Sequence, residues 1–416
     1  MSKVVVEGGA RLQGTVGVLG AKNAALKEMV SALLAPGRHR LTNVPAILDV
    51  SLMCRVLEHT GCHVEQNGHE LWLVVPDDLR PEAPIELVRQ MRASIVVLGP
   101  LLARCGEARV ALPGGDDLGA RPIDMHLNGL EAMGADFELV HGELVARVDG
   151  RLKGTEVELS FPSVGATENL LFAGALADGE TVIVNAAREP EIEDLITQLV
   201  TMGADITGAG TSLVTIRGVE QLSPVEHSVI PDRLEAGTYA AASAITSGDV
   251  TITGCNPEHL RMELLKLEEA GCEVERGNGW LRVKGPERPS PVDFATLPFP
   301  GFHTDMQPQM VALLSLATGT SVITENLYDA RFRYVGELAR MGADITTEAQ
   351  HALIRGVERL SGCPVLAPDI RAGAALVLAG LRAVGTTEVG QAEHIDRGYE
   401  GFSEKLHSLG ARIERA

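Results

Sequence analysis

A short pattern recurs six times along this 416-residue chain and limits how the chain can fold. The copies read HTGCHVE, AMGADFE, TMGADIT, EAGCEVE, RMGADIT and SLGARIE, and their glycines are Gly61, Gly134, Gly203, Gly271, Gly342 and Gly410. Consecutive glycines lie 68 to 73 residues apart. A helix that ends at a glycine cap and is followed by a strand explains each copy.

Two further segments precede each glycine. About twenty residues upstream, most copies have a β-branched strand that leads through a turn into a helix: HRLTNVPAIL, ARVALPGGDD, TVIVNAAREPE, VTITGCNPEHL, SVITENLYDA and TTEVGQAEHI. Further upstream lie segments that are apolar on nearly all sides, which predicts buried helices: AALKEMVSALLA, ASIVVLGPLLA, ATENLLFAGALA, AGTYAAASAIT, QPQMVALLSLA and AGAALVLAGLRA. Six units of about 70 residues predict two domains of three, with helices inside and strands outside. A plain open α/β sheet remains the alternative at this point.

Composition and simple motifs argue against several classes of protein function. The chain has 36 Lys and Arg against 56 Asp and Glu, and aromatic residues make up only 3%, which argues against a nucleic-acid partner. No apolar run reaches the length of a membrane span, and the start MSKVVVEGG lacks a signal core, so we expect a cytoplasmic protein. Six dispersed cysteines without CxxC predict reduced thiols and no metal site. Neither GxxxxGK[ST] nor GxGxxG is present, so any nucleotide is bound by another device.

The starts of the predicted buried helices carry unusual charges. The segments LGAKNAAL, MRASIVVL, PSVGATENL, PDRLEAGTY, HTDMQPQM and DIRAGAAL place six residues at equivalent positions: Lys22, Arg92, Ser163, Arg233, Asp305 and Arg371. Four of these are cations, which oppose the helix dipole. The pattern indicates an anionic ligand, although single members can also be surface charges or can tie the two domains together.

Three other segments carry possible chemistry. The loop LPGGDDLGARP at 112–122 combines glycines with Asp116, Asp117 and Arg121, which suits either a closing lid or a solvated turn. HIDRGY at 394–399 precedes the last helix, and ENLYDARFRYV places Arg331 and Arg333 after a strand, as a surface pair or a functional one.

Nine segments together resemble a known family. In chain order, GAKNAAL, MRAS, LPGGDDLGARP, SVGAT, NAAREPE, TDMQ, ENLYDARF, DIRAG and HIDRGYE resemble the UDP-N-acetylglucosamine 1-carboxyvinyltransferase family of enolpyruvyl transferases. The resemblance implies an α/β fold with an inside-out α/β barrel in each of two domains. One domain would span 21–230 and carry the mobile loop 112–122. The other would combine 1–20 with 231–416, and the active site would lie in the cleft between them.

The resemblance also implies a reaction. The enolpyruvyl group of phosphoenolpyruvate would move to the 3′-hydroxyl of UDP-N-acetylglucosamine by addition and elimination, with release of phosphate, as the first committed step of peptidoglycan synthesis. The implied partners are these two small molecules. No metal and no organic cofactor is implied, and the sequence does not indicate an oligomeric state.

Roles follow residue by residue from the matching motifs. Catalytic roles fall to Lys22, Asp116, Asp305 and Arg397, with Asp305 on the sugar hydroxyl as candidate base. Phosphoenolpyruvate would meet Lys22, Arg121 and Arg397 around its phosphate and Arg331 and Arg371 near its carboxylate, and it would also meet Asn23. UDP-N-acetylglucosamine would meet Asn23, Arg92, Arg121, Pro122, Ile123, Asp124, Met125, Ser163, Val164, Gly165, Asp305 and Leu327. Arg233 has a less direct assignment.

Three positions depart from the family pattern. Most members carry Cys where this chain has Asp116. A carboxyl group can still act as general acid if it is protonated. It is a poorer nucleophile toward an epoxide than a thiolate, so the chain is expected to resist fosfomycin. His303 stands where Pro is expected, and Phe161 stands near a position where some relatives have Lys.

Three other functions remain open. The first is the shikimate-pathway enolpyruvyl transferase, which differs in its acceptor. The second is a sugar-nucleotide binder without catalysis, although Lys22, Asp305, Arg397 and an acid at 116 exceed what binding requires. The third is an acidic structural repeat protein, which would leave the cations at the helix starts unexplained.

Overall fold

The computed structural model describes residues 2–116 and 118–416. They form two compact units. Unit 1 contains the chain up to Leu19, Asp116–Arg121 and Pro231–Ala416, and unit 2 contains Gly20–Gly115 and Pro122–Ile230. The family resemblance implies that the whole loop 112–122 belongs to the domain 21–230. In the structure its residues 116–121 belong instead to unit 1, because Leu118 accepts a hydrogen bond from the backbone N of Ala330 (3.2 Å).

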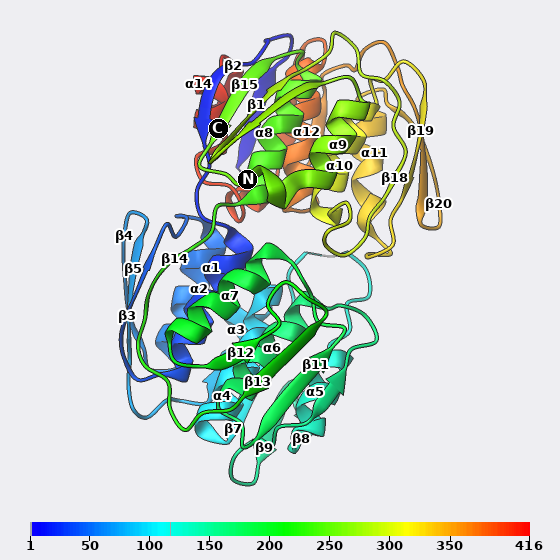
Figure 1. Cartoon of the computed structure of the whole chain (residues 1–416). Coiled ribbons are helices and arrows are strands. Elements are labelled where there is room, and N and C mark those ends of the chain that lie inside the picture. The colour runs from blue at the N-terminus through cyan, green and yellow to red at the C-terminus, as the bar shows by residue number, and fades with distance from the viewer. Residues whose placement is uncertain (1, 117) are drawn as a thin grey trace. The chain divides into compact units, whose positions relative to one another are not determined.

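Apolar helices form the centre of each unit (Figure 1). In unit 1 the helices α8 (Arg233–Ile245), α10 (Gln307–Leu314) and α12 (Ile370–Arg382) pack against one another. In unit 2 the corresponding helices are α1 (Lys22–Ser31), α4 (Leu98–Cys105) and α6 (Val164–Ala175). Every residue of α8 is buried, because a helix at the centre has no face in solvent. The predicted buried helices are confirmed.

A second set of helices ends at the recurring glycines. These helices are α2 (Leu48–His59), α5 (Asp124–Ala132), α7 (Pro190–Thr201), α9 (Arg261–Glu269), α11 (Val335–Arg340) and α14 (Phe402–Ser408). Each ends two residues before its glycine, whose φ lies between 96° and 108°. Only glycine adopts this conformation without strain, and a strand follows each time, as the repeat predicted.

Shorter helical segments complete the helical structure. They are α3 (Ile85–Val88), α13 (Glu393–Asp396), η1 (Ala32–Leu34), η2 (Arg92–Val97), η3 (Pro257–Leu260), η4 (Thr304–Met306) and η5 (Arg331–Tyr334). Within residues 2–116 and 118–416, no helix is both long enough and apolar enough to cross a membrane.

In the described chain, six four-stranded sheets surround these helices, three in each unit. The unit 1 sheets are β22 (Pro364–Leu366), β23 (Thr386–Gly390), β1 (Lys3–Glu7), β24 (Arg412–Arg415); β16 (Glu273–Gly277), β17 (Trp280–Lys284), β15 (Asp249–Thr253), β2 (Gln13–Gly17); and β18 (Phe294–Ala295), β19 (Thr320–Thr324), β21 (His351–Arg355), β20 (Asp344–Glu348). The unit 2 sheets are β10 (Glu156–Glu158), β11 (Glu180–Val184), β13 (Leu213–Arg217), β12 (Asp205–Thr207); β14 (Glu226–Ser228), β3 (Gly37–Thr42), β5 (Glu70–Val75), β4 (His63–Asn67); and β6 (Glu82–Ala83), β7 (Glu107–Ala111), β9 (Glu143–Val148), β8 (Ala135–Val140).

All six sheets share one pairing pattern. One edge strand (β2, β6, β10, β14, β18 or β22) is parallel to its neighbour, and the other pairings are antiparallel. For β6, β10, β18 and β22, this strand precedes a central helix in the same unit. Strand β2 instead precedes the point where the chain enters unit 2, yet it pairs with β15 of unit 1. Strand β14 likewise precedes the return to unit 1, yet it pairs with β3 of unit 2.

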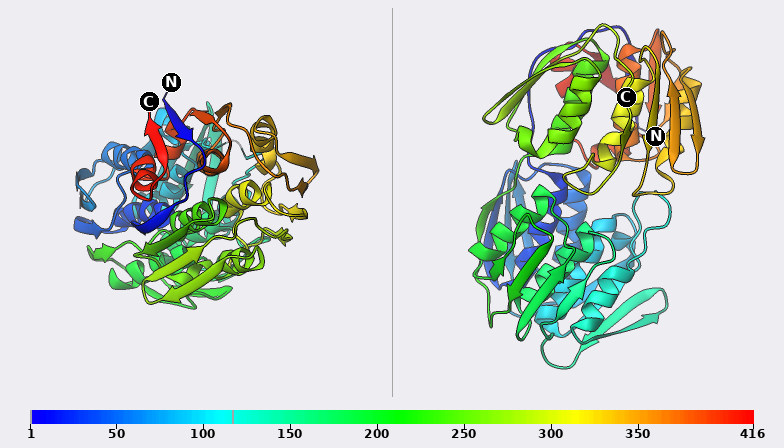
Figure 2. Two further views of the ribbon diagram at one scale, coloured as in Figure 1. Left: turned by 90° about the horizontal axis from the view of Figure 1, so that it is seen from above. Right: turned by 45° about the vertical axis from the view of Figure 1, so that its right-hand side comes forward.

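The first strand of the chain closes the last sheet. β1 lies between β23 and β24, and the backbones of Lys3 and Ala416 exchange two hydrogen bonds (2.8 and 2.9 Å). Figure 2 shows the two ends of the chain side by side in unit 1. Each unit encloses one apolar core, between its central helices and its three sheets.

A buried acidic cluster lies beneath β14 in unit 2. A carboxylate oxygen of Glu28, one of Asp194 and a ring nitrogen of His227 lie within 4.8 Å of one another. His227 Nε2 lies 3.1 Å from Asp194 Oδ1, and the backbone N of Ile230 donates to Asp194 Oδ2 (2.9 Å). Burial and the neighbouring Asp194 raise the pKa of Glu28 well above its usual value. Burial therefore favours the protonated form of Glu28 in the folded chain.

Replacing Glu28 by Gln is expected to remove a pH dependence of stability. With a folded pKa raised above the unfolded value of about 4.3, Glu28 must take up a proton on folding above that pH. Its favourable contribution is complete below the unfolded pKa and is lost as pH rises toward the folded pKa, by up to about 1.4 kcal/mol per pH unit. In urea unfolding at pH 5, 6.5 and 8, the free energy of unfolding of Glu28→Gln should increase relative to that of the wild type as pH rises. The exposed control Glu65→Gln should not, and parallel curves for wild type and Glu28→Gln would contradict this assignment.

Candidate active site

Two arginines from separate elements of unit 1 bind the carboxylate of Asp305. Asp305 lies in η4, just before α10, and both of its oxygens accept hydrogen bonds. Arg331 Nη2 donates to Oδ1 and Arg371 Nε donates to Oδ2, each at 3.2 Å. The two arginine side chains are only 2% and 4% exposed. Residues that the sequence separates by up to 66 positions therefore form one ion cluster.

The arginines set the charge state of Asp305. Burial alone would raise the pKa of this carboxyl group, but the positive charges of Arg371 and Arg331 outweigh burial and hold the pKa well below its usual range. Asp305 is thus an anion with low basicity in the ligand-free chain.

The arginine pair retains hydrogen-bonding capacity. Within the part of the chain that the structure describes, the buried atoms Arg371 Nη1 and Arg331 Nε have no hydrogen-bond partner. Arg371 is held from two sides: its guanidinium lies 5.1 Å from the centre of the Tyr399 ring, and its backbone N donates to Asp369, the N-cap of α12 (2.8 Å). A rigid, buried arginine pair with unused donors suits a second carboxylate.

A second acidic residue meets an arginine in the same unit. Asp116 and Arg397 form an ion pair, and each side chain is 16% exposed. Arg121 lies 5.0 Å from the ring centre of Tyr328. Asp116, Leu118 and Arg121 thus contact the rest of unit 1 through an ion pair, a hydrogen bond from Ala330 and a cation–π contact, respectively.

The loop glycines have a packing role. A Cβ on Gly114 would lie 1.8 Å from the carbonyl oxygen of Arg89, and one on Gly115 would lie 2.9 Å from the backbone N of Arg92. Gly115 and Gly119 also have φ of 100° and 93°. Close approach of the backbone and positive φ therefore require glycine here.

Side-chain acceptors fix the backbone N–H groups of Asp305 and Leu327. His303 caps η4 through Nδ1, which accepts from the backbone N of Asp305 (2.9 Å). Glu325 Oε1 accepts from the backbone N of Leu327 (2.9 Å). The His303 departure thus supplies a side-chain cap directly beside Asp305.

Unit 2 contains several of the other residues that the sequence singles out. Lys22 is the first residue of α1 and pairs with Asp49 of α2 at 2.8 Å, with both side chains largely buried. The neighbouring Asn23 is half-buried. Arg92 donates through Nη2 to the carbonyl oxygen of Pro122 (3.1 Å), which connects η2 to the segment before α5.

The start of α6 carries the SVG motif. Ser163 is the N-cap, and its Oγ accepts from the backbone N of Ala166 (3.3 Å). The backbone N–H groups of Val164 and Gly165 belong to the first turn, where a helix supplies no acceptor. The helix start therefore offers donors to an anion. Phe161, the third departure, is 40% exposed two residues before Ser163.

The structure places the remaining site residues as follows. Ile123 is the N-cap of α5, whose first residues are Asp124 and Met125. Arg233 starts α8, and its guanidinium lies 5.5 Å from the centre of the Phe299 ring.

Sequence reasoning missed the partners of the predicted residues. Asp49 pairs with Lys22, Tyr399 lies against the Arg371 guanidinium, and Asp369 caps α12. Asp369 carries a readable signal, because Asp directly before a helix is a preferred N-cap. Asp49 and Tyr399 carry none, since only the fold brings them to their partners.

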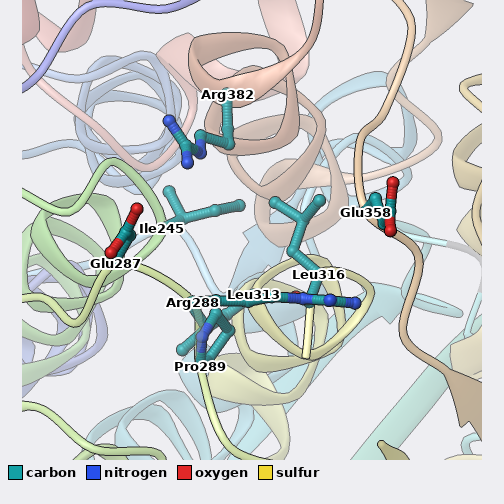
Figure 3. A pocket seen from close by; sticks show the side chains of 8 residues that line it. All are labelled: Ile245, Glu287, Arg288, Pro289, Leu313, Leu316, Glu358 and Arg382. Atoms are coloured by element: carbon teal, nitrogen blue, oxygen red, sulfur yellow. The ribbon is translucent and has the colours of Figure 1, made fainter. Parts of the chain in front are cut away.

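Unit 1 also contains a cavity with a volume of about 340 Å³ (Figure 3). Its lining residues are Ile245, Glu287, Arg288, Pro289, Leu313, Leu316, Glu358 and Arg382, and none of them is among the predicted site residues. Arg288 donates to the carbonyl oxygens of Leu316 and Ala317 (3.0 and 2.8 Å), which gives it a structural role.

Comparison with known proteins shows the family. The family model described as EPSP synthase (3-phosphoshikimate 1-carboxyvinyltransferase) matches residues 6–406. The UDP-N-acetylglucosamine 1-carboxyvinyltransferase of Corynebacterium jeikeium is 54% identical over 99% of this chain and 98% of its own length. The protein of that name from Anaeromyxobacter sp. is 54% identical over 100% of this chain and 99% of its own.

A solved structure supports the same assignment. The enolpyruvyl transferase NikO from Streptomyces tendae superposes with a TM-score of 0.90 at 26% identity, over 100% of this chain and 99% of that one. The expected fold class is thereby confirmed. The chain belongs to the enolpyruvyl transferase family, and within it to the full-length relatives of the UDP-N-acetylglucosamine 1-carboxyvinyltransferases.

Proposed function

We propose that this chain transfers the enolpyruvyl group of phosphoenolpyruvate to the 3′-hydroxyl of UDP-N-acetylglucosamine and releases phosphate. The reaction would be the first committed step of peptidoglycan synthesis and would take place in the cytoplasm. The relatives at 54% identity carry the name of this activity.

One observation carries the proposal: the buried pair Arg331 and Arg371 holds one carboxylate and has unused donors for another. Phosphoenolpyruvate supplies such a carboxylate. Its phosphate would bind Lys22, Asn23, Arg121 and Arg397, because a multiply charged phosphate requires several cationic or hydrogen-bonding partners.

The chemistry proceeds in two balanced steps. In the addition, Asp116 delivers a proton to the methylene carbon of phosphoenolpyruvate while the sugar 3′-oxygen bonds to the adjacent carbon and gives its proton to Asp305. In the elimination, the new methyl group returns a proton to Asp116, the carbon–carbon double bond re-forms, and the carbon–oxygen bond to phosphate breaks. The proton that Asp305 took from the hydroxyl leaves with the phosphate. Arg397 and Lys22 stabilise the phosphate charge in both steps.

Both proposed acid–base groups pair with arginines assigned to phosphoenolpyruvate. Asp305 pairs with Arg331 and Arg371, and Asp116 pairs with Arg397. A substrate carboxylate that shares Arg331 and Arg371 offsets the charges that lower the pKa of Asp305. Binding of phosphoenolpyruvate would therefore raise the basicity of Asp305 when the reaction requires it.

The remaining residues would hold the sugar nucleotide. We assign the uridine to Arg121, Pro122, Ile123, Asp124 and Met125, and the diphosphate to Ser163, Val164 and Gly165. Asn23 and Arg92 would contact the nucleotide and the intermediate, and the backbone of Leu327 would contact the acetamido sugar.

Phosphate release from phosphoenolpyruvate tests the function. One reaction receives UDP-N-acetylglucosamine as acceptor and a second receives shikimate 3-phosphate. Release with the sugar nucleotide alone supports the proposal. Release only with the shikimate compound would assign the chain to the shikimate-pathway reaction, to which the matching family model also refers. Binding of the sugar nucleotide without release in either reaction would indicate a binding protein.

Fosfomycin is expected to leave the wild-type activity intact, because position 116 offers a carboxylate where most of the family has a thiol. Asp116→Cys should keep activity and become subject to irreversible inactivation by fosfomycin. Rapid, stoichiometric inactivation of the wild type would contradict the assignment of Asp116.

Three of the six native thiols are expected to give little background in this assay. Burial raises the pKa of Cys54 and Cys272 to about 12 and that of Cys255 to about 11, so these side chains are poor nucleophiles at neutral pH. Mass spectrometry of the treated Asp116→Cys protein should therefore place the adduct on residue 116.

A further inference from the structure

The carboxylate of Glu325 connects several segments of unit 1. Glu325 directly follows β19 and is only 3% exposed. Its Oε1 accepts hydrogen bonds from the hydroxyl of Thr296 (2.9 Å) and from the backbone N of Leu327 and of Tyr328 (2.9 and 3.2 Å). Its Oε2 accepts from the hydroxyl of Thr304 (3.0 Å). One buried side chain therefore joins segments that lie up to 29 positions from it in the sequence.

Two of these partners belong to turns that carry assigned site residues. Thr304 immediately precedes Asp305, the proposed base, and both residues lie in η4. Leu327 is the residue whose backbone we assign to the acetamido sugar. Because its N–H group donates to Glu325, the carbonyl oxygen is the backbone group that Leu327 can offer to a ligand, and this acceptor suits an acetamido N–H.

The acceptor sugar sets a geometric requirement. Its 3′-hydroxyl and its acetamido group are attached to neighbouring ring carbons, so the base and the Leu327 carbonyl must be held at a matching separation. Glu325 is a direct connection between their turns, because Oε2 binds Thr304 and Oε1 binds Leu327. Misplacing a reacting group by about 1 Å can cost about 10²-fold in rate.

Hydrogen bonds to Thr296 stiffen this connection. The backbone N of Asn326 donates to Thr296 Oγ1 (3.0 Å), and Asn326 Nδ2 donates to the carbonyl oxygen of Thr296 (3.1 Å). The Thr296 hydroxyl in turn donates to Glu325. The turn after β19 is therefore bound to the carboxylate both directly and through Thr296, and such a buried network favours a single geometry.

The charge of Glu325 acts on the same site. Burial lowers the pKa of Arg331, but the negative charges of Asp305, then Asp369 and Glu325, outweigh burial and raise this pKa. Glu325 can therefore influence the site through its position or through its charge, and the experiment has to separate the two.

We propose that Glu325 is a positioning residue of the acceptor site: Oε2 fixes the turn of Asp305 and Oε1 fixes that of Leu327, so that the base and the acetamido contact meet one sugar ring together. The proposal rests on the proposed function, since both groups belong to UDP-N-acetylglucosamine. It makes Glu325 a determinant of specificity, because an acceptor without the acetamido group cannot use the Leu327 carbonyl.

Two conservative substitutions of Glu325 separate position from charge. Glu325→Gln keeps the length, and its amide can still accept from Leu327 and donate to the Thr304 hydroxyl. Glu325→Asp keeps the charge but is one methylene shorter, so it cannot hold both turns. Phosphate release with UDP-N-acetylglucosamine should fall by about tenfold or more in Glu325→Asp and much less in Glu325→Gln. The reverse order would show that the charge matters and would overturn the positioning role.

Acceptor specificity is a readout that general structural damage would not change. Calorimetry compares UDP-N-acetylglucosamine with UDP-2-deoxyglucose, which has no hydrogen-bond donor at the carbon that carries the acetamido group. Glu325→Asp should lower the ratio of the two affinities by about tenfold, because it weakens binding of the acetamido ligand alone. Glu337→Asp is a matched control: Glu337 Oε2 also accepts from a backbone N, that of Leu366 (2.9 Å), but neither residue is assigned to the site. Its turnover and affinity ratio should equal those of the wild type.

Thr304→Val tests the Oε2 contact alone. Valine keeps the shape of the side chain but cannot donate to Glu325, while the bonds from Oε1 to the turn of Leu327 remain. We expect kcat to fall by about tenfold, since the turn of Asp305 loses its anchor, and the affinity ratio to stay as in the wild type. An unchanged kcat would remove Oε2 from the proposed role.

The outcomes separate this inference from the proposed function. If the wild type turns over UDP-N-acetylglucosamine and Glu325→Asp keeps both its turnover and its affinity ratio, the inference fails and the proposed function stands. If the wild type neither binds nor turns over the sugar nucleotide, both fail. If circular dichroism shows that Glu325→Asp does not fold, Glu325→Gln and Thr304→Val decide: high activity in the first and a lower kcat in the second support the inference, and any other result overturns it.

Discussion

Replacing Asp116 by alanine is expected to lower turnover by about 10²- to 10⁴-fold, the range that loss of a general acid gives. Asp116 is the acidic side chain that pairs with Arg397 in segment 116–121 of unit 1. Without it, the acid that we assign to the methylene carbon is missing. Steady-state phosphate release should show the loss, and exchange of the methylene protons with deuterium from solvent should fall with it.

Binding measurements separate this chemical loss from structural damage. The affinity of Asp116→Ala for UDP-N-acetylglucosamine should match the wild type, since Asp116 is not among the residues that we assign to the nucleotide. Asp116→Cys, which restores an acidic side chain, should recover turnover. Full activity in Asp116→Ala would exclude Asp116 from the mechanism.

Asp305→Asn is the second variant with a large expected effect. Asparagine keeps the shape of the side chain but cannot accept the sugar hydroxyl proton, so turnover should fall by about 10²- to 10⁴-fold. The same change removes the anion that occupies Arg331 and Arg371. Phosphoenolpyruvate, measured in the presence of the sugar nucleotide, should therefore bind more tightly than to the wild type while turnover is nearly lost.

This opposite movement of affinity and rate is a result that misfolding would not produce. Asp344→Asn is a suitable control, because Asp344 also pairs with an arginine, Arg355 at 3.2 Å, but on the surface. Its kinetics should equal those of the wild type. Weaker binding of phosphoenolpyruvate to Asp305→Asn would show that Asp305 organises the arginines and does not compete with the substrate.

Local sequence patterns predict the fold because each repeat contains residues that mark where its helices begin and end. The glycine of every copy takes a positive φ two residues after a helix, and the all-apolar segments are the central helices. These features depend on a few neighbouring residues, so one sequence is sufficient to see them. The loop 112–122 was harder, because the contacts of Leu118 and Arg121 with Ala330 and Tyr328 cross some 200 positions of the chain.

For the same reason, the sequence predicts residues of the candidate site but not the partners that these residues contact. Motifs identify Lys22, Asp305 and Arg371, but no pattern shows that Lys22 pairs with Asp49 or that Arg371 lies over Tyr399. Nor can a motif show that Asp305 lies between two arginines, the fact that sets its pKa. Such properties arise from packing between distant elements.

The placement of β2 and β14 affects the order in which the two units can fold as the chain emerges from the ribosome. β1 and β2 emerge early, yet their partners β23 and β15 are made much later. Unit 2, by contrast, has all its strands once β14 has emerged. We therefore expect unit 2 to fold during synthesis while β1 and β2 wait as unpaired strands, the kind of segment that chaperones protect from aggregation.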